Sequence, residues 1–266
     1  MTDDQKVEFE AQGYLVLNGV FDPDELEQMR LAFDRAAESD GLDDLPNRDD
    51  RFIHLAEHPA IFPAVHRILS DDLQVRSLKG TGIPSGAPGR GWRREVGGLL
   101  GVHHALSTLS VQVTIHLDDV PERGACISVV PGSHRFRSDL AFPDIAHIEE
   151  MPHRVGLQVK AGAALLLHGN LWQARNRNRS DASLRLLEIT YVHCWMRQAL
   201  PELSPQVVEG IAPSHNLSQL FGIDVDETHA QGYWGRRVVG YASSTGLPER
   251  RFSELKVVGK GVTPNS

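Results

Sequence analysis

The sequence contains few cysteines, no long apolar segment and no excess of positive charge. Only Cys126 and Cys194 are cysteines among 266 residues, too few for a disulfide framework or a cysteine-ligated zinc site. No apolar run approaches the roughly 20 residues that a membrane-spanning helix requires. The acidic, polar N-terminus also lacks the apolar core of a secretory signal. These absences predict a cytoplasmic protein.

The shortage of basic residues restricts the partners. The formal net charge is −8, which argues against nucleic acid and anionic membranes, because both bind basic surfaces. The basic clusters Arg93–Arg94 and Arg175–Arg179 are expected to be solvated loops or anion contacts. Apolar residues make up 41% and charged residues 23%, as in ordinary globular proteins. We therefore expect one domain over residues 1–266, a small-molecule substrate as partner, and a homo-oligomer as an open possibility.

The N-terminal part of the chain has helical patterns. Residues 4–12 predict a short helix, followed by a strand at Tyr14–Leu17. A second helix is predicted after Asp22, which suits an N-cap, with Pro23 at the first helical position and Glu25 completing a capping box. The remaining expectations are an acidic loop at residues 41–51 and helices at Pro59–Leu69, Ser204–Glu209 and Asn216–Phe221.

Short strands separated by turns predominate from Leu73 onward, which favours a sandwich or jelly roll. The segment Gly80–Gly101 contains eight glycines, typical of a mobile lid or a long covering loop. The predicted strands are Leu109–Leu117, Ala125–Val130, Gly156–Val159, Ala163–Leu167 and Leu184–Val192.

Three segments carry recognisable motifs: Phe9–Leu17 with Phe21–Leu26, Ile115–His134, which ends in Pro-Gly-Ser-His, and Ala161–Arg185. Together they resemble the phytanoyl-CoA dioxygenase family of iron(II)/2-oxoglutarate enzymes. The resemblance implies a mainly β protein with α additions, a double-stranded β-helix (a cupin-like jelly roll) flanked by N-terminal and C-terminal helices. It also implies that the Pro-Gly-Ser-His signature makes a tight turn and that His134 does not touch iron.

The family's metal-binding residues are mostly replaced. Its chemistry needs two histidines and one carboxylate on iron, with open positions for 2-oxoglutarate and oxygen. The resemblance implies that His103 matches the first histidine, but Ala105 stands where the carboxylate belongs, and a shift by one residue puts Leu106 there. Counting back from the Asn-x-Ser motif at 178–180 places Gln173 at the distal histidine. We therefore expect no metal and no cofactor.

An iron- and 2-oxoglutarate-dependent reaction stays open as an alternative. Related halogenases lack the carboxylate and read His-x-Ala or His-x-Gly, a pattern that His103 and Ala105 satisfy. A neutral amide at the distal position is a poor iron ligand. Such a site would need a substitute from His104, His116 or His168.

Two groups of residues are expected to form the site. Gln112, Thr114 and His116 alternate with apolar residues on one strand, so they share a face that looks into a jelly-roll cavity or into solvent. His103 and His104 are candidate bases. Gln173 is a candidate for orienting a substrate, although it also suits a hydrogen-bonding filler.

Further residues are candidates for substrate binding. Arg185 resembles the arginine that holds 2-oxoglutarate in the family, with an offset of one residue from the family spacing, and is otherwise a structural salt bridge. Trp92 and Arg94 lie in the glycine-rich segment and could cover an anionic or flat ligand. Trp172 suits a pocket wall or the core.

These features favour a metal-independent enzyme on a dioxygenase-like scaffold. It would perform a cyclisation, isomerisation or elimination on a small natural-product intermediate by holding one conformer and moving one proton. An oxygenase or halogenase with substitute ligands is the first alternative. A non-catalytic binding or accessory protein is the second.

Overall fold

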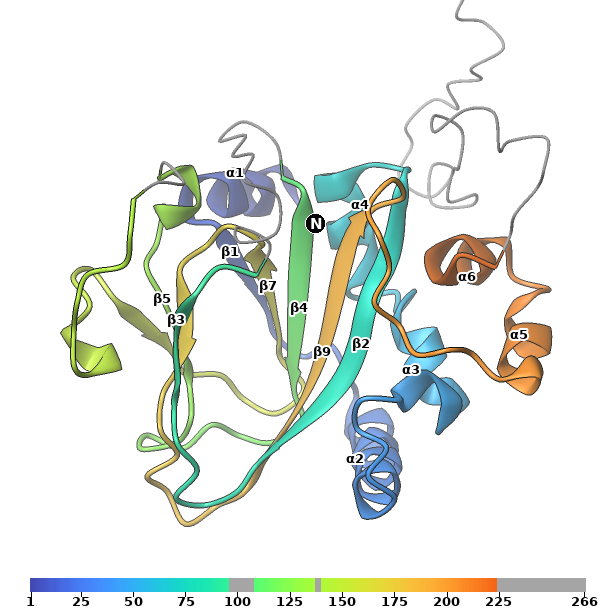
Figure 1. Cartoon of the computed structure of the whole chain (residues 1–266), viewed down its shortest axis with the longest axis horizontal. Coiled ribbons are helices and arrows are strands. Elements are labelled where there is room, and N and C mark those ends of the chain that lie inside the picture. The colour runs from blue at the N-terminus through green and yellow to red at the C-terminus, as the bar shows by residue number, and fades with distance from the viewer. Residues whose placement is uncertain (96–107, 137–139, 224–266) are drawn as a thin grey trace, which may run out of the picture.

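Two antiparallel sheets face one another in the computed structural model, which describes residues 1–95, 108–136 and 140–223. The larger sheet has the strand order β1-β7-β4-β9-β2, and the smaller has the order β3-β8-β5-β6 (Figure 1). Neighbouring strands come from distant parts of the chain, as expected of a jelly roll. The predicted fold class, mainly β with flanking helices, is confirmed.

The strands of the larger sheet form a continuous antiparallel array. Its longest pairing joins β2 to β9 over ten residue pairs, from Leu73–His193 to Ile83–Leu184. β4 lies at the centre and pairs with both β7 and β9. The bounds are β1 Tyr14–Leu17, β2 Leu73–Ile83, β4 Ser110–His116, β7 Ala164–His168 and β9 Leu184–His193.

The strands of the smaller sheet are short, and they pair across long sequence distances. Arg93 of β3 pairs with Gln173 of β8, and Gln173 pairs with Val129 of β5. The bounds are β3 Arg90–Arg93, β5 Ile127–Val129, β6 Val155–Leu157 and β8 Gln173–Arg175.

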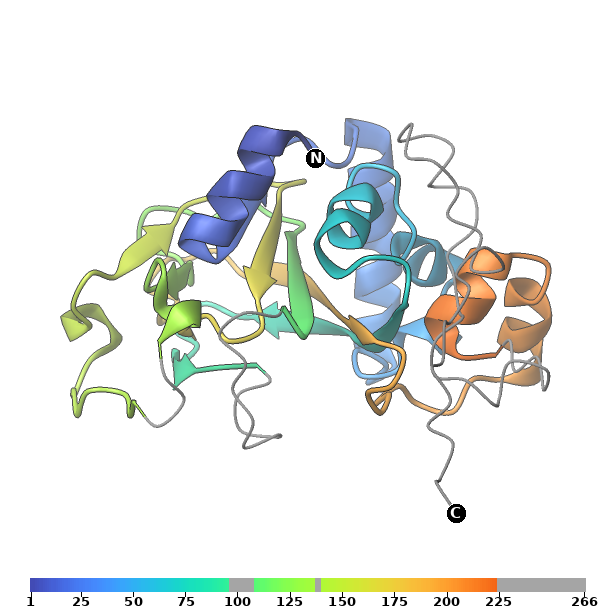
Figure 2. The same cartoon turned by 90° about the horizontal axis from the view of Figure 1, so that it is seen from above.

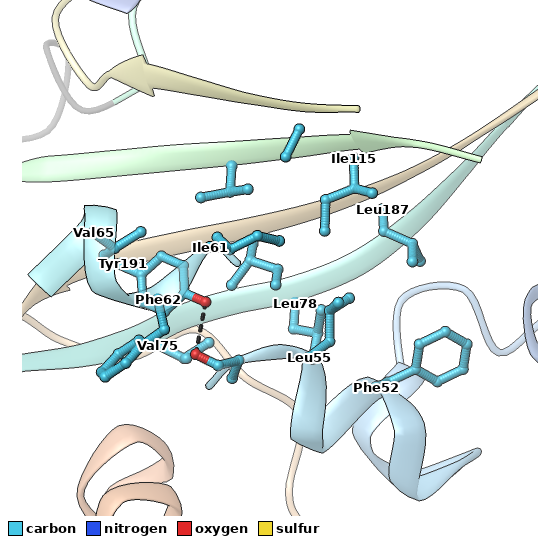
Figure 3. Packing of buried hydrophobic residues seen from close by; sticks show 14 of the residues in the cluster. Phe52, Leu55, Ile61, Phe62, Val65, Val75, Leu78, Ile115, Leu187 and Tyr191 are labelled. Carbon is cyan, nitrogen blue, oxygen red and sulfur yellow. Dashed lines mark hydrogen bonds between the residues drawn. The ribbon is translucent and has the colours of Figure 1, made fainter. Parts of the chain in front are cut away.

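Helices cover the outer face of the larger sheet (Figures 1 and 2). Phe62, Leu55 and Phe52 pack against Ile115, Leu187 and Tyr191 of the sheet (Figure 3). The Tyr191 hydroxyl donates to the carbonyl oxygen of Ala56 at 2.9 Å, which satisfies the one polar atom of that ring. The helices are α1 Asp3–Gln12, α2 Pro23–Glu38, α3 Asp50–Leu55, α4 Phe62–Leu69, α5 Pro205–Ile211 and α6 His215–Phe221.

Two local predictions in this helical layer were wrong. Asp22 caps α2 by accepting from the Glu25 backbone at 2.8 Å, but the Glu25 carboxylate lies 3.0 Å from Nε2 of His58 instead of completing a capping box. The expected loop at residues 41–51 contains a 3₁₀ turn at Leu45–Asn47 and the start of α3. Leu45 is fully buried there, so tertiary packing orders a segment whose acidic composition indicated a loop.

The glycine-rich segment also differs from the expected lid or covering loop. Its first residues belong to β2, and Arg90–Arg93 form β3; residues 96–101 lie outside the described part. At Gly80 a Cβ atom would come within 2.8 Å of the side chains of Phe33 and Leu42. This glycine therefore permits α2 and the following segment to approach the sheet closely.

Each face of β4 has its own chemistry, as its alternating pattern predicts. Val111, Val113 and Ile115 belong to the apolar core under the helices. The intervening polar side chains point to the space between the two sheets, because Gln112 is hydrogen-bonded to Gln173 of the smaller sheet. No helix among the described residues is long and apolar enough to cross a membrane.

Candidate functional site

A chain of hydrogen bonds crosses the interior of the roll from one sheet to the other. The Thr81 hydroxyl donates to Oε2 of Glu188 at 2.9 Å, and Nε2 of Gln112 donates to Oε1 of Glu188 at 2.9 Å. Nε2 of Gln173 then donates to Oε1 of Gln112 at 2.8 Å. Gln112 and Gln173 are almost completely buried, so these bonds form in a medium of low polarity, where they are strong.

The carboxylate at one end of this chain fixes the direction of every amide in it. An ionised carboxylate only accepts hydrogen bonds, so Gln112 must direct its NH₂ group to Glu188 and its carbonyl to Gln173. Gln173 must in turn use an N–H for Gln112. This leaves Gln173 with its carbonyl oxygen and one N–H for another partner, at the place where the family resemblance puts a histidine.

Three further polar side chains on the same face of β4 have buried atoms with no hydrogen-bond partner in the described part of the chain. These atoms are both ring nitrogens of His116 and the hydroxyl oxygens of Thr114 and Ser110, although each residue is only 1% exposed. Burial lowers the pKa of His116 to about 4, a change that the nearby Asp118 charge opposes. The imidazole is therefore neutral at pH 7, with one donor and one acceptor nitrogen.

Two half-buried arginines of the smaller sheet lie near this interior group. Arg93 and Arg175 lie on the same face as Gln173, and both experience the charge of Glu188. The Nη2 atom of Arg93 lies 3.3 Å from Oε2 of Glu95. The sequence indicated both arginines only as members of basic clusters, and it gave no sign of Glu188, because strand pairing alone brings these residues together.

Arg185 does not join the interior group. Its guanidinium contacts Asp118 through Nε at 3.0 Å and Nη2 at 2.7 Å, and Nη1 reaches Asp34 of α2 at 2.9 Å. These hydrogen bonds, that of Asp118 first, raise the pKa of Arg185. Its neighbours Leu184 and Leu186 face the interior. The structure thus places Arg185 in a salt bridge, the alternative that the sequence left open beside an anion anchor.

The predicted substrate-binding residues Trp92, Arg94 and Trp172 also lie apart from the interior chain. They gather on the opposite face of the smaller sheet, where the Arg94 guanidinium lies 5.3 Å from the Trp172 ring and 5.2 Å from the Phe142 ring. Trp92 packs at the same cluster. Because neighbouring strand residues alternate in direction, Arg93 points inward where Arg94 does not.

The Pro-Gly-Ser-His signature makes a tight turn, as the resemblance implies. Gly132 has φ 78° and begins a 3₁₀ turn over Ser133–Arg135. The His134 ring packs 4.8 Å from that of His168 and so close to Gly13 that a Cβ atom there would lie 2.4 Å from its Nδ1. Both histidines help to join α1 to the end of the sheets.

The candidate bases His103 and His104, together with Ala105, lie outside the described residues. The structure therefore says nothing of how they are placed, and their role stays a prediction. Within residues 1–95, 108–136 and 140–223, no group of three or more histidine, cysteine, aspartate or glutamate side chains could hold a metal ion.

This fold defines the class of protein as a cupin-like jelly roll, and the sequence defines the family. The family model of phytanoyl-CoA dioxygenase (PhyH) matches residues 9–186. The chain therefore belongs to the phytanoyl-CoA dioxygenase family. No curated protein sequence matches it significantly.

Several solved structures share the fold. HygX from Streptomyces hygroscopicus, with nickel and 2-oxoglutarate bound, is 20% identical over 74% of this chain and 89% of its own, with a TM-score of 0.62. SnoK, a non-heme alpha ketoglutarate dependent carbocyclase from nogalamycin biosynthesis, is 22% identical over 73% and 84%, with a TM-score of 0.61. The epimerase SnoN, in complex with Fe³⁺, alpha ketoglutarate and nogalamycin RO, is 18% identical over 72% and 83%, with a TM-score of 0.61.

The described donor set does not fit iron and 2-oxoglutarate as the family binds them. At the distal ligand position Gln173 offers a neutral amide in place of an imidazole, and the oxygen of such an amide is a weak ligand for iron(II). The arginine expected to hold 2-oxoglutarate is occupied by two aspartates on the other side of the sheet. Neither an imidazole nor a free guanidinium therefore stands at the two inherited positions that this part of the chain contains.

Proposed function

We propose that the protein is an enzyme that performs a non-redox step, such as a cyclisation, isomerisation or elimination, on a small organic molecule without a metal ion. The observation that carries the proposal is the hydrogen-bonded chain from Gln173 through Gln112 to Glu188, in which Gln173 has the position that the family resemblance assigns to the distal histidine. A natural-product intermediate is the proposed class of substrate, because two proteins of similar fold, SnoK and SnoN, have names that refer to nogalamycin and its biosynthesis.

The interior residues supply the functions that such a step needs. The Glu188 carboxylate fixes both amides before a substrate arrives, so the Gln173 amide would hold a substrate group in one orientation at little cost in entropy. Thr114 and His116 present unsatisfied polar atoms on the same face. As a neutral imidazole, His116 would accept one hydrogen bond and donate another. The base that moves the proton is proposed to be His103 or His104.

A second candidate is a metal- and 2-oxoglutarate-dependent enzyme with substitute ligands. It is favoured by the structural neighbours, since HygX binds nickel with 2-oxoglutarate, and SnoK is alpha ketoglutarate dependent. A non-catalytic binding protein is the third, and the same experiment separates all three.

The test uses the mass of the product. The full-length protein, treated with EDTA and kept free of oxygen, is incubated with a library of polyketide and other natural-product intermediates and examined by mass spectrometry. The proposal expects a product of unchanged formula, or one lighter by a water or another small neutral molecule. A product that gains oxygen or halogen or loses two hydrogens, only with added iron(II), 2-oxoglutarate and oxygen, would support the second candidate and contradict the first.

Variants connect such an activity to the interior chain. His116→Asn and Gln173→Leu are expected to lower turnover by about tenfold or more, as for the loss of a group that acts in the transition state. His54→Asn changes an exposed histidine on α3 and serves as the matched control. Full turnover in both interior variants would show the assignment to be wrong. Ligand binding without any turnover would support the binding protein.

A further inference from the structure

One interior arginine has no ion-pair partner among the residues that the structure describes. Arg175 follows Gln173 by two residues on β8, so the two side chains point to the same side of the smaller sheet. Its Nε is buried and makes no hydrogen bond to any residue that the structure describes. Arg175 therefore differs from Arg185, whose Nε and both Nη atoms contact carboxylate oxygens.

A second guanidinium lies beside it. Arg93 is the strand partner of Gln173, and its Nε is also buried, with no hydrogen bond among the described residues. Within that part of the chain, the one carboxylate that it contacts is that of Glu95, through Nη2. Burial lowers the pKa of both arginines, the charge of Arg90 acts on both in the same direction, Arg93 adds to the effect on Arg175, and Glu188 counteracts the change in both. Two cations thus share one side of the interior.

The Glu188 carboxylate, whose charge acts on both arginines, forms hydrogen bonds to uncharged side chains. Glu188 accepts from Thr81 and Gln112, one at each oxygen, and among the described residues no contact of ion-pair length joins it to either arginine. A structural pair would bring the two charges together, because leaving a charge unpaired is costly even where it is half-buried, as in both arginines. Among the described residues, the two guanidinium groups therefore keep buried Nε atoms whose hydrogen-bonding capacity the protein does not use.

We propose that Arg175, together with Arg93, binds a carboxylate or similar planar oxyanion of the substrate, which makes the substrate a small organic acid. The fork of N–H groups on a guanidinium matches two oxygens of a carboxylate. The inference rests on the proposed function, since it takes the interior of the roll as the substrate site. This anion site lies on the smaller sheet, at positions other than the inherited arginine position.

Binding of a simple anion tests the site without knowledge of the substrate. The EDTA-treated, full-length protein is titrated calorimetrically with benzoate and with benzamide, its uncharged counterpart. Benzoate is expected to bind more tightly than benzamide, and Arg175→Met is expected to weaken benzoate binding by about tenfold or more, the loss of one charge-assisted contact. Arg177→Met, at an exposed position two residues further on, is the control and is expected to bind as the parent does.

Stability provides an independent readout. Because Arg175 has no ion-pair partner among the described residues, Arg175→Met is expected to leave the thermal midpoint unchanged or to raise it by up to about 4 °C. Arg185→Met removes the guanidinium that pairs with Asp34 and Asp118, and it is expected to lower the thermal midpoint. Equal losses in the two variants would show that Arg175 is structural and would overturn the proposal, as would benzoate binding that is absent or unaffected by Arg175→Met.

The two proposals can fail separately. If benzoate binding depends on Arg175 but no EDTA-resistant turnover exists with any intermediate, the anion site stands and the proposed function fails. If turnover is found and persists in Arg175→Met, the function stands and the anion site fails. Titration with 2-oxoglutarate in EDTA adds a check, since the site is expected to bind this dicarboxylate through Arg175 without converting it.

Discussion

The two faces of the larger sheet are equally buried, but they differ in whether their buried polar atoms have hydrogen-bond partners. On the outer face, Ile115, Leu187 and Tyr191 pack under the helices, and the only polar atom in that group has a partner. On the inner face, Ser110, Thr114 and His116 have four buried polar atoms with no hydrogen-bond partner among the described residues. Unsatisfied buried groups lower stability. Four such atoms on the inner side of one strand therefore mark this face of β4 as the candidate site, and its apolar face as the support.

The largest effect is expected on the outer face. Ile115→Ala removes a fully buried side chain between β4 and the helices, and it should lower the free energy of unfolding by about 2–5 kcal/mol. Urea denaturation at pH 7 measures the change. A loss below about 1 kcal/mol would mean that this face is not the closely packed support that the comparison requires.

The next effect depends on pH and belongs to His116. Its pKa is about 4 in the folded protein and about 6.5 in an unfolded chain. Below pH 6.5 the unfolded chain binds the proton more readily, so stability is full above pH 6.5 and decreases toward pH 4, by about 3 kcal/mol in total.

The replacement His116→Asn should remove that part of the pH dependence. Urea midpoints at pH 7, 5.5 and 4.5 are compared between the parent and the variant. His168, whose pKa burial lowers to about 3, changes stability in the same direction and remains in both proteins, so the difference between them isolates His116. Parallel pH profiles would contradict the placement of an unpartnered neutral imidazole on the inner face.

A smaller loss in the free energy of unfolding is expected for Gln173, which links the two sheets through its hydrogen bond to Gln112. Gln173→Leu keeps much of the side-chain volume but leaves Oε1 of Gln112 without its donor, at a cost of about 1–3 kcal/mol. The double variant Gln112→Leu, Gln173→Leu is the control, because it removes both partners together and tests whether the two losses add. Strict additivity of the single losses would indicate that the two amides do not interact.

The smallest effect is expected at Thr114, the residue that directly precedes Ile115. Its hydroxyl has no hydrogen-bond partner in the part of the chain that the structure describes, so Thr114→Val should change the free energy of unfolding by less than about 1 kcal/mol in either direction. Measured beside Ile115→Ala, this pair compares the two faces at adjacent positions. Similar losses at both positions would remove the distinction between a site face and a support face.

The sequence predicted β1, β4, β7 and β9 of the larger sheet, but not β2, its longest strand, whose end lies in the glycine-rich segment that was expected to be a lid or covering loop. β4, β7 and β9 lie within one residue of the predicted bounds at each end, since their apolar periodicity is a local signal. Two strands of the smaller sheet were not predicted, because Arg90–Arg93 and Gln173–Arg175 are short and polar. Only pairing with distant partners makes them strands.

The candidate site was predicted only in part, because alternation along one strand is a local signal, whereas the face on which a residue of another strand lies depends on strand pairing. The inward face of Gln112, Thr114 and His116 followed from alternation along one strand. Arg185 and Arg94 were each assigned to the ligand although the strand turns them the other way, because a shift of one residue moves a side chain to the opposite face. The one-residue offset of Arg185 from the family spacing was therefore the signal that it does not point inward.

By itself, the sequence determined the family, the alternating face of β4 and the amide at position 173, since each depends on residue types and spacings along one segment. Only the tertiary structure decided that Glu188 orients Gln112 and, through it, Gln173, and that Arg175 lacks the carboxylates that Arg185 has. Those relations join residues far apart in the chain, and they depend on which strands pair and on which side each side chain emerges.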